Sequence, residues 1–309
     1  MSILVVGSVA LDSVETPFGR AERVLGGSAV FFGAAASLFG RVLMVGVVGD
    51  DYPLPDLAFL EERGADLSGL ERASGKSFFW EGRYSYDLNS RETVETRLGV
   101  FADFRPVIPE AFRDARFVFL GNIDPTLQRE VLEQVRSPEL VVCDTMNYWI
   151  EGSRGPLLDL LPRVDILLVN DAEARQLSGE FNLLRSARWI QRHGPEYVVV
   201  KKGEHGAILF ARDWVFFAPG YPLEEVFDPT GAGDAFAGGF LGYLSGSRTV
   251  EREELRRAVM YGSATGSFAV QAFSVDRFRD LTPLEVAHRV EEFRDMTAFE
   301  HELEGTRDV

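Results

Sequence analysis

The feature that most constrains the fold is a series of short apolar runs, rich in β-branched residues and separated by longer segments with helical periodicity. Most runs are continuously apolar, as expected for parallel strands that are covered by helices on both faces. The runs are Ile3–Gly7, Val42–Val48, Phe117–Leu120, Leu140–Cys143, Asp165–Val169 and Tyr197–Lys201. Repeated strand–helix units in this order predict a doubly wound α/β fold with a mostly parallel sheet flanked by helices. Ligands of such sheets bind beyond the carboxyl ends of the strands.

The segments between these runs repeat apolar residues every three or four positions, which is typical of helices with one buried face. Three such faces are Leu127, Val131, Leu132 and Val135; Phe236, Phe240, Tyr243 and Leu244; and Val286, Val290 and Phe293. A chain of 309 residues can bury a large core without disulfides or metals. We therefore expect residues 1–309 to form one α/β domain.

Two stretches, residues 12–25 and 77–101, interrupt the strand–helix pattern and resemble short strands with turns. In the second, Phe79, Glu81, Arg83, Ser85 and Asp87 alternate with Trp80, Gly82, Tyr84 and Tyr86. This alternation predicts a strand with a mixed polar and aromatic face. We interpret the two stretches as a small β-sheet lid over the site, with an ordinary edge hairpin as the alternative.

Charge and cysteine content narrow the function classes. The formal net charge is −16 at pH 7, which argues against nucleic acid or an anionic membrane as partner because both attract basic surfaces. The single Cys143 cannot form an internal disulfide, which fits a reducing compartment. The N-terminus lacks a signal-peptide pattern, and the longest apolar stretch, residues 26–39, is too short to cross a bilayer. We expect a soluble, cytoplasmic protein.

The segment Asp228–Phe240 carries the strongest chemical signal. Gly231 and Gly233 lie just where an apolar helix begins near Ala232, so free N–H groups and the helix dipole can bind an anion there. Asp234, in the first turn, can take a proton from an alcohol held beside that anion. An anion site with a carboxylate base suits phosphoryl transfer to a hydroxyl. The alternative is a structural helix with an acidic first turn.

A second glycine pair, Gly26-Gly27, precedes a helix of small residues and allows close approach of a ligand or of a neighbouring strand. The residues alone leave these two interpretations open. Asp12 follows the first strand, where it can bind a polyol or simply stabilise a turn.

Taken together, these segments resemble the ribokinase-like (PfkB) carbohydrate kinases. The run Asp228–Phe240 resembles the C-terminal signature of that family, and Gly26-Gly27 its N-terminal signature. Further matching segments follow in the order of the family: Gly7 to Asp12, Gly46 to Asp51, Asp144, Asn170 to Glu173, and Lys201 to Ala207. The resemblance spans nearly the whole chain and implies ATP-dependent transfer of a phosphoryl group to a hydroxyl of a small sugar or polyol.

The resemblance also implies roles for individual residues. Asp234 would deprotonate the acceptor, and the N–H groups of Gly231, Ala232 and Gly233 would form an anion hole. Expected to bind ATP are Asn170, Glu173, Lys202, Gly203, Thr230, Gly231, Gly233 and Ala264. Glu173 would hold Mg²⁺ through water, since this ion keeps several waters. Expected to bind the acceptor are Asp12, Gly26, Gly27, Phe31, Asn122 and Asp234.

The chain departs from the family at Phe31, where an asparagine commonly binds sugar hydroxyls. An aromatic ring can stack on a sugar or a base instead, and the lid candidates Trp80, Tyr84, Tyr86 and Asn89 add similar surface. A nucleoside acceptor is therefore an alternative to a sugar or polyol. The family also suggests K⁺ activation near residues 228–230 and a homodimer formed through the lid.

Two further alternatives come from other classes. The first is a non-catalytic protein on the same fold that binds nucleotide or sugar, against which the retained Asp234 argues. The second is a dinucleotide-dependent oxidoreductase, against which Gly7-Ser8-Val9-Ala10 argues because it lacks the glycine fingerprint.

Overall fold

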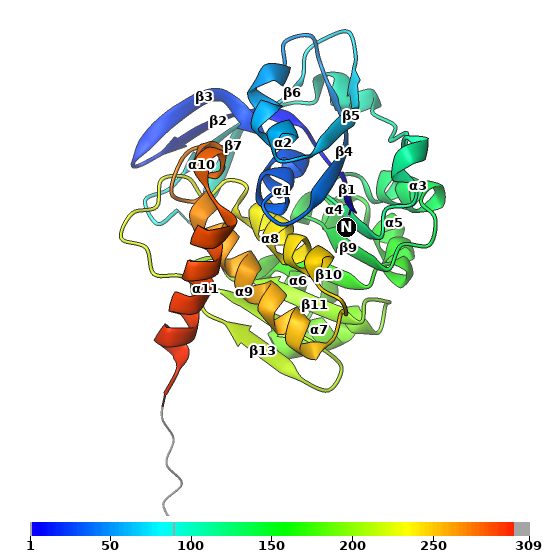
Figure 1. The fold of residues 1–309 in the computed structure, drawn as a ribbon. Coiled ribbons are helices and arrows are strands. Elements are labelled where there is room, and N and C mark those ends of the chain that lie inside the picture. Colours follow the sequence, from blue (N-terminus) through cyan, green and yellow to red (C-terminus); the bar gives the residue numbers. More distant parts are fainter. Residues whose placement is uncertain (1, 89, 300–309) are drawn as a thin grey trace, which may run out of the picture.

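A long, mostly parallel sheet runs through the centre of the protein (Figure 1). The computed structural model describes residues 2–88 and 90–299, and within them the sheet has the order β13-β12-β11-β10-β9-β8-β1-β4-β5. Pairing is parallel from β5 to β11, and antiparallel for β12 and β13. The strands are β1 Ser2–Val6, β4 Arg41–Val48, β5 Asp66–Arg72, β8 Phe117–Leu120, β9 Leu140–Asp144, β10 Ile166–Asn170, β11 Tyr197–Lys201, β12 Ala207–Phe210 and β13 Val215–Ala218. All six predicted runs are strands of this sheet.

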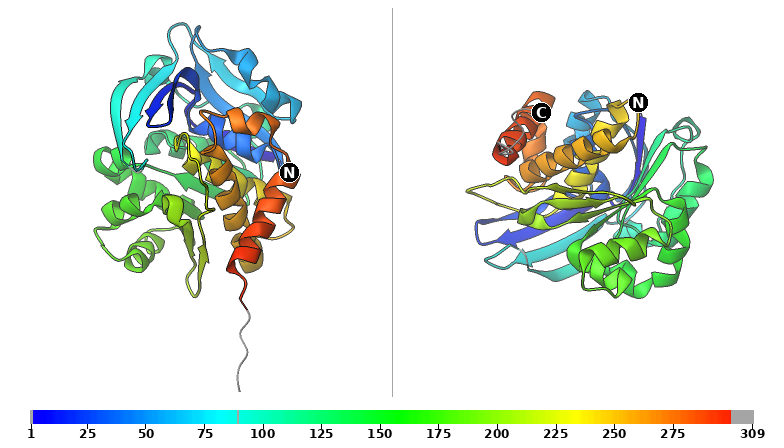
Figure 2. Two further views of the ribbon diagram at one scale, coloured as in Figure 1. Left: turned by 90° about the vertical axis from the view of Figure 1, so that its left-hand side faces the viewer. Right: turned by 90° about the horizontal axis from the view of Figure 1, so that it is seen from below.

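Helices cover both faces of the sheet, which lies between them in the right-hand view of Figure 2. One face carries α1 Ser28–Ala36, α2 Ala58–Glu62, α8 Ala232–Gly246, α9 Arg252–Ala269, α10 Asp276–Asp280 and α11 Pro283–Thr297. The other carries α3 Pro125–Gln134, α4 Asn147–Gly152, α5 Arg154–Leu160, α6 Asp171–Ser178 and α7 Leu183–Gln191. Short 3-10 helices occupy Leu54–Leu57, Gly99–Asp103, Glu110–Phe112, Leu161–Arg163 and Gly203–His205.

The sheet contributes alternate residues to two separate hydrophobic cores. In β1, Ile3 and Val5 pack under the α1/α8 layer, whereas Leu4 and Val6 pack under the α3/α5 layer. The single cysteine, Cys143 of β9, is completely buried in the second core. This two-sided burial explains why the strand sequences are continuously apolar.

A second, smaller sheet stands apart from the main one and has the order β3-β2-β6-β7. Its strands are β2 Ala10–Thr16, β3 Gly19–Gly26, β6 Phe78–Tyr84 and β7 Arg91–Arg97. They come from the two stretches expected to form the lid, residues 12–25 and 77–101, so a doubly wound fold with a small extra sheet is confirmed. Asn89 lies outside the described residues. A single domain over 1–309 stays a prediction.

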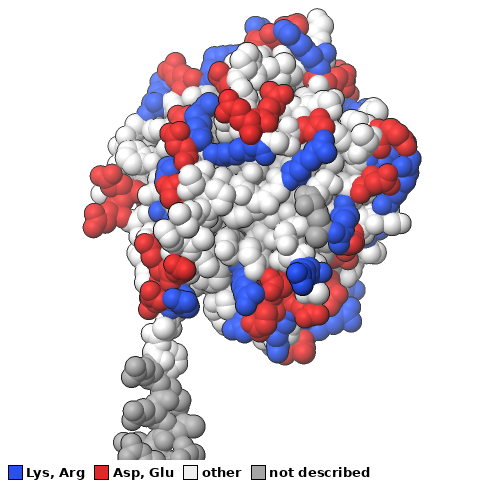
Figure 3. Space-filling model, in the orientation of Figure 1, with Lys and Arg blue, Asp and Glu red and all other residues white. Residues whose placement is uncertain are grey.

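Acidic and basic side chains are interspersed over the face of the molecule shown in Figure 3. Many form ion pairs there and elsewhere, such as Arg41 with Asp66 at 2.9 Å. Among the helices described, none is long and apolar enough to span a membrane.

Candidate active site

Polar side chains gather at the carboxyl ends of four neighbouring parallel strands. Lys201 is the last residue of β11, Asn170 of β10 and Asp144 of β9, and Asn122 follows β8 by two residues. Asn170 and Lys201 are register partners, so the strand ends coincide. The chain therefore brings these residues together at the edge of the sheet where ligands of doubly wound folds bind.

The glycine turn lies at the N-terminus of α8. Gly231 is the N-cap residue with φ 73°, and no side chain caps this helix. A Cβ on Gly231 would lie 2.3 Å from the Phe31 ring, so the turn rests directly on that ring. Phe31 is only 2% exposed. In this conformation the ring supports the turn, and its stacking on an acceptor stays a prediction.

A buried ion pair stands against the same turn. Lys201 Nζ lies 2.6 Å from Asp144 Oδ2, and both side chains are largely buried. A Cβ on Gly233 would come within 3.0 Å of Lys201 Nζ. Although burial opposes its charge, the carboxylates of Asp144, Glu173 and Asp234 raise the Lys201 pKa. A fixed positive charge thus adjoins the open helix N-terminus.

Sequence reasoning selected Lys202 and missed Lys201. Lys202 and Gly203 lie just beyond β11, where Lys202 precedes the short 3-10 helix Gly203–His205. The sequence held one signal for Lys201, which is a lysine at the end of an otherwise apolar strand. A charged residue at the carboxyl end of such a strand lies at the ligand-binding edge of the sheet.

Asp234 lies in the first turn of α8, as predicted. Loss of hydration and the neighbouring Asp144 raise the pKa of Asp234 to about 7, while Lys201 and Arg91 act in the opposite direction. A carboxylate with a pKa near neutrality can accept a proton from an alcohol more effectively than an ordinary aspartate.

Asn170 and Glu173 form a capping box at the start of α6. Asn170 Oδ1 accepts from the Glu173 N–H at 2.8 Å, and Glu173 Oε2 accepts from the Asn170 N–H at 2.7 Å. Burial and Asp144 raise the pKa of Glu173 to about 7. Glu173 keeps a second carboxylate oxygen outside the box, and Mg²⁺ prefers oxygen ligands and water. The donor set therefore fits a water-mediated ion at Glu173. Within the described residues, no cluster of three or more His, Cys, Asp or Glu side chains could hold a metal directly.

Asp12 and the glycine pair lie together at the lid end of the site. A Cβ on Gly26 would meet the Asp12 carboxylate at 2.1 Å, and the Gly27 N–H lies beside the same group. Burial, Asp228 and Asp234 raise the pKa of Asp12 to about 8. The glycines thus allow Asp12 to approach the chain closely, which supports packing and leaves its role toward an acceptor a prediction.

Two further residues predicted to contact ligands, Asn122 and Ala264, have defined surroundings in the structure. Asn122 Oδ1 accepts from Trp149 Nε1 at 2.9 Å, and Asn122 Nδ2 lies 3.0 Å from Met146 Sδ. Ala264 is completely buried in the core under α8 and α9, so its side chain has no surface for a nucleotide. A place for Ala264 beside the nucleotide stays a prediction.

The lid touches the glycine turn through one hydrogen bond. Thr230 Oγ1 donates to the Tyr84 hydroxyl of β6 at 3.1 Å, and the Thr230 N–H donates to Asp228 Oδ1 at 2.8 Å. The turn is therefore fixed from both the loop and the lid. Sequence reasoning missed this contact because it joins residues 146 positions apart.

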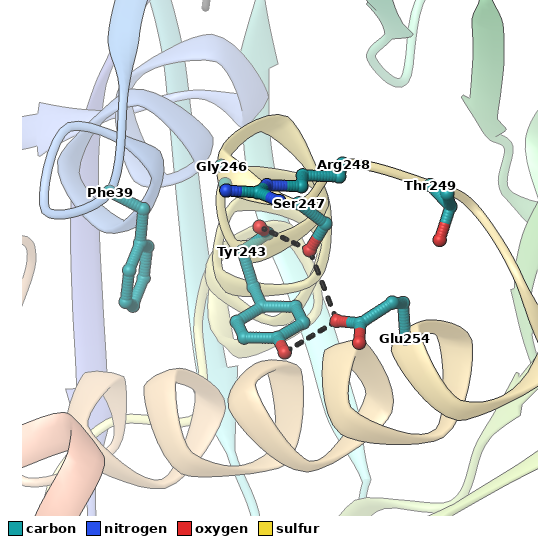
Figure 4. A pocket seen from close by; sticks show the side chains of 8 residues that line it. Phe39, Tyr243, Gly246, Ser247, Arg248, Thr249 and Glu254 are labelled. Carbon is teal, nitrogen blue, oxygen red and sulfur yellow. Dashed lines mark hydrogen bonds between the residues drawn. The ribbon is translucent and has the colours of Figure 1, made fainter.

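The opposite end of α8 borders a separate pocket of about 470 Å³ (Figure 4). There the Glu254 carboxylate accepts from the Tyr243 hydroxyl at 2.7 Å and from the Ser247 hydroxyl at 3.2 Å. These polar groups bond to one another. The uncapped N-terminus of α8, with Asp234 and Lys201, is the end equipped for chemistry.

Comparison with known proteins assigns the family. The family model described as pfkB family carbohydrate kinase matches residues 107–279, more than half of the chain. A cytidine kinase from Thermococcus kodakarensis is 32% identical over 257 residues, covering 81% of this chain and 91% of that protein. An aminoimidazole riboside kinase from Salmonella typhimurium is 34% identical over 285 residues, covering 87% and 89%. The crystal structure of a nucleoside kinase from Methanocaldococcus jannaschii, a member of the ribokinase family, superposes with a TM-score of 0.74 at 21% identity, covering 94% and 98%.

By name, these two curated relatives are kinases of cytidine and of aminoimidazole riboside. The signature turn at α8, the fold and both sequence matches agree, and the protein belongs to the pfkB family of carbohydrate kinases.

Proposed function

We propose that this protein is a nucleoside kinase that transfers the γ-phosphoryl group of ATP to a hydroxyl of a nucleoside. The observation that carries the proposal is the pairing of Asp234 with the uncapped N-terminus of α8 and the adjoining Lys201. A base, the open helix N-terminus and a fixed cation supply what phosphoryl transfer to an alcohol requires. The nucleoside as acceptor is supported by the relatives named cytidine kinase and aminoimidazole riboside kinase.

In this proposal Asp234 accepts the proton of the acceptor hydroxyl. The Gly233 N–H, together with Lys201, stabilises negative charge on the phosphoryl oxygens, while the Ala232 N–H donates to the Pro229 carbonyl at 3.3 Å in this conformation. Glu173 would hold Mg²⁺ through water, and the ion would supply charge neutralisation to the ATP phosphates. Asp12 accepts hydrogen bonds from the acceptor, and the lid excludes water that would otherwise compete for the phosphoryl group.

The test is ADP release with Mg-ATP across a matched panel of acceptors. Cytidine, uridine, adenosine, inosine and aminoimidazole riboside are compared with ribose, fructose and inositol, each with and without K⁺. We expect acceptor-dependent turnover on at least one nucleoside and much weaker turnover on free sugars. Turnover on sugars alone would contradict the nucleoside assignment. ATP binding without turnover on any acceptor would favour the non-catalytic binding protein instead.

A further inference from the structure

The pocket at the C-terminal end of α8 lies away from the candidate active site (Figure 4). The turn after α1 contributes Phe39 to its lining, the loop after α8 contributes Arg248, and α9 contributes Glu254. Its volume of about 470 Å³ lies within the range of roughly 300–1,000 Å³ that is typical of small-molecule sites. Since α8 has 15 residues, about 20 Å of helix separates this pocket from the glycine turn.

The pocket has an open floor and an aromatic wall. Gly242 and Gly246 lie one turn apart on α8 and therefore share a face of the helix. A Cβ on Gly246 would meet nothing within 4 Å, whereas one on Gly242 would strike the Phe39 ring at 2.8 Å. Behind this floor, Phe39 meets Tyr261 edge to face at 5.6 Å, and Tyr243 stacks on Tyr261 at 4.4 Å. The wall is thus rigid, and ring faces of this kind stack on planar groups.

The negative groups at the pocket already have partners. Glu254 Oε1 accepts from Arg257 Nη1 at 2.8 Å, and Oε2 accepts from the Tyr243 and Ser247 hydroxyls. The end of α8 is capped, because the Leu244 carbonyl accepts from the Ser247 N–H at 3.0 Å. Little negative charge is therefore left to repel an anion.

Arg248 brings a positive charge to the rim. Figure 4 shows its side chain lying across the end of α8 beside Gly246. Within residues 2–88 and 90–299, neither its guanidinium nor the hydroxyl of the neighbouring Thr249 has a hydrogen-bond or ion-pair partner. By contrast, Arg256 of the adjacent α9 pairs with Glu253 at 3.1 Å. The guanidinium of Arg248 is thus available to an anion from solution.

We propose that this pocket is a second binding site that takes a nucleoside 5′-phosphate. The base lies against the rings of Phe39 and Tyr243, and the phosphate pairs with the Arg248 guanidinium and the Thr249 hydroxyl. A guanidinium presents two parallel N–H groups that match phosphate oxygens, and aromatic faces stack on bases. A nucleoside monophosphate and ADP both carry this chemistry. The site does not depend on the proposed kinase function, because no group of the active site takes part in it.

Hydrogen exchange of the full chain, read by mass spectrometry, tests the proposal. The probes are cytidine 5′-monophosphate, ADP, cytidine and inorganic phosphate. We expect a nucleotide to slow exchange over residues 242–250, separately from any effect at the active-site turn, residues 228–234. Cytidine or phosphate alone should have a much smaller effect, because each fills only half of the site. The stronger of the two nucleotides identifies the source of the ligand.

Two variants and two matched controls locate the site. Gly246→Leu fills the open floor, and Arg248→Ala removes the charge at the rim. Gly152→Leu is the control for the first, since Gly152 also ends a helix and has nothing within 4 Å of its Cβ position. Arg212→Ala, an exposed arginine in the turn between β12 and β13, is the control for the second. Titration of the exchange over 242–250 should give a Kd at least about tenfold weaker in both pocket variants and unchanged in both controls.

Three results would overturn the site: nucleotide-dependent slowing confined to residues 228–234, wild-type affinity in both pocket variants, or an equal response to inorganic phosphate alone. A wild type that shows slowing at 242–250 but no acceptor-dependent ADP release would overturn the proposed function and leave this site standing. The melting temperature of each variant shows that it is folded.

Discussion

Two helices, α6 and α8, begin at the carboxyl edge of the sheet on its opposite faces, and their N-termini are built in opposite ways. At α6, the side chains of Asn170 and Glu173 satisfy backbone N–H groups in a capping box. At α8, Gly231 provides no side chain and the first turn has no side-chain cap. Both first turns carry a carboxylate whose pKa is raised to about 7.

The difference shows how one structural motif serves two purposes. A capped helix start is complete within the chain, so its residues contribute to stability. An uncapped start leaves N–H groups that need a partner, and a bound anion can supply it. We therefore expect changes at α8 to act mainly on turnover, and changes at α6 to act on folding as well as on the Mg²⁺ site proposed at Glu173.

The largest effect is expected for Asp234→Asn. The amide cannot accept the acceptor proton, so turnover should fall by about 10²–10⁴-fold. Binding of ATP should stay close to that of the wild type, because the turn and Lys201 are unchanged. Steady-state kinetics and calorimetry measure the two quantities. Turnover near the wild-type value would exclude Asp234 as the base.

The next effect is expected for Gly231→Ala, with Gly179→Ala as the matched control. Both glycines have positive φ, 73° and 75°, but a Cβ on Gly231 would strike Phe31 whereas one on Gly179 meets nothing within 4 Å. Both variants should lose about 1 kcal/mol of stability or more. Only Gly231→Ala should also lose turnover, by about 10²-fold, since it displaces the anion site. Equal kinetics for the two would refute the distinction between the helices.

A smaller effect, dependent on pH, is expected for Glu173→Gln. The folded chain raises the pKa of Glu173 from 4.5 to about 7, so the protonated form is favoured by folding. The contribution of Glu173 to the stability of the wild type is present in full below about pH 4.5 and is lost as the pH rises through 7. Glutamine keeps the cap without the charge. Denaturant titrations should show equal stability at pH 4 and a gain of roughly 1–3 kcal/mol for Glu173→Gln at pH 8. A gain that is the same at both pH values would rule out this charge as the cause.

The smallest effect is expected for Asn170→Ala. Loss of an N-cap side chain typically costs about 1 kcal/mol, and Asn182→Ala at the start of α7 is the matched control. Both melting temperatures should fall by similar amounts. If turnover falls only in Asn170→Ala, Asn170 acts on ATP as the family resemblance implies, and the contrast between α6 and α8 is weaker than we propose.

The periodic parts of the fold could be predicted from the sequence because local patterns determine them. The strands Phe117–Leu120 and Tyr197–Lys201 have the predicted bounds, and α8 begins at Ala232. The two lid stretches could also be recognised from their interruption of the pattern. Each of these features can be recognised from the residue pattern within a single segment of the sequence.

The remaining site features depend on how distant segments meet. Whether Tyr84 of the lid reaches the glycine turn is set by its contact with Thr230, which lies 146 positions further along the chain. The sequence does not reveal which side of α9 Ala264 occupies, because small residues lie on several faces of that helix. Lys201 and Lys202 are adjacent in the sequence, and the choice between them depends on the fact that β11 ends at Lys201.

The complete burial of Cys143 gives the protein a built-in chemical probe. The thiol lies in β9, one residue before Asp144, and burial together with that carboxylate raises the Cys143 pKa strongly. Only the exposed thiolate reacts with alkylating reagents. Labelling of the native protein therefore requires the central strands to separate, and its rate measures how often the sheet opens beneath the active site.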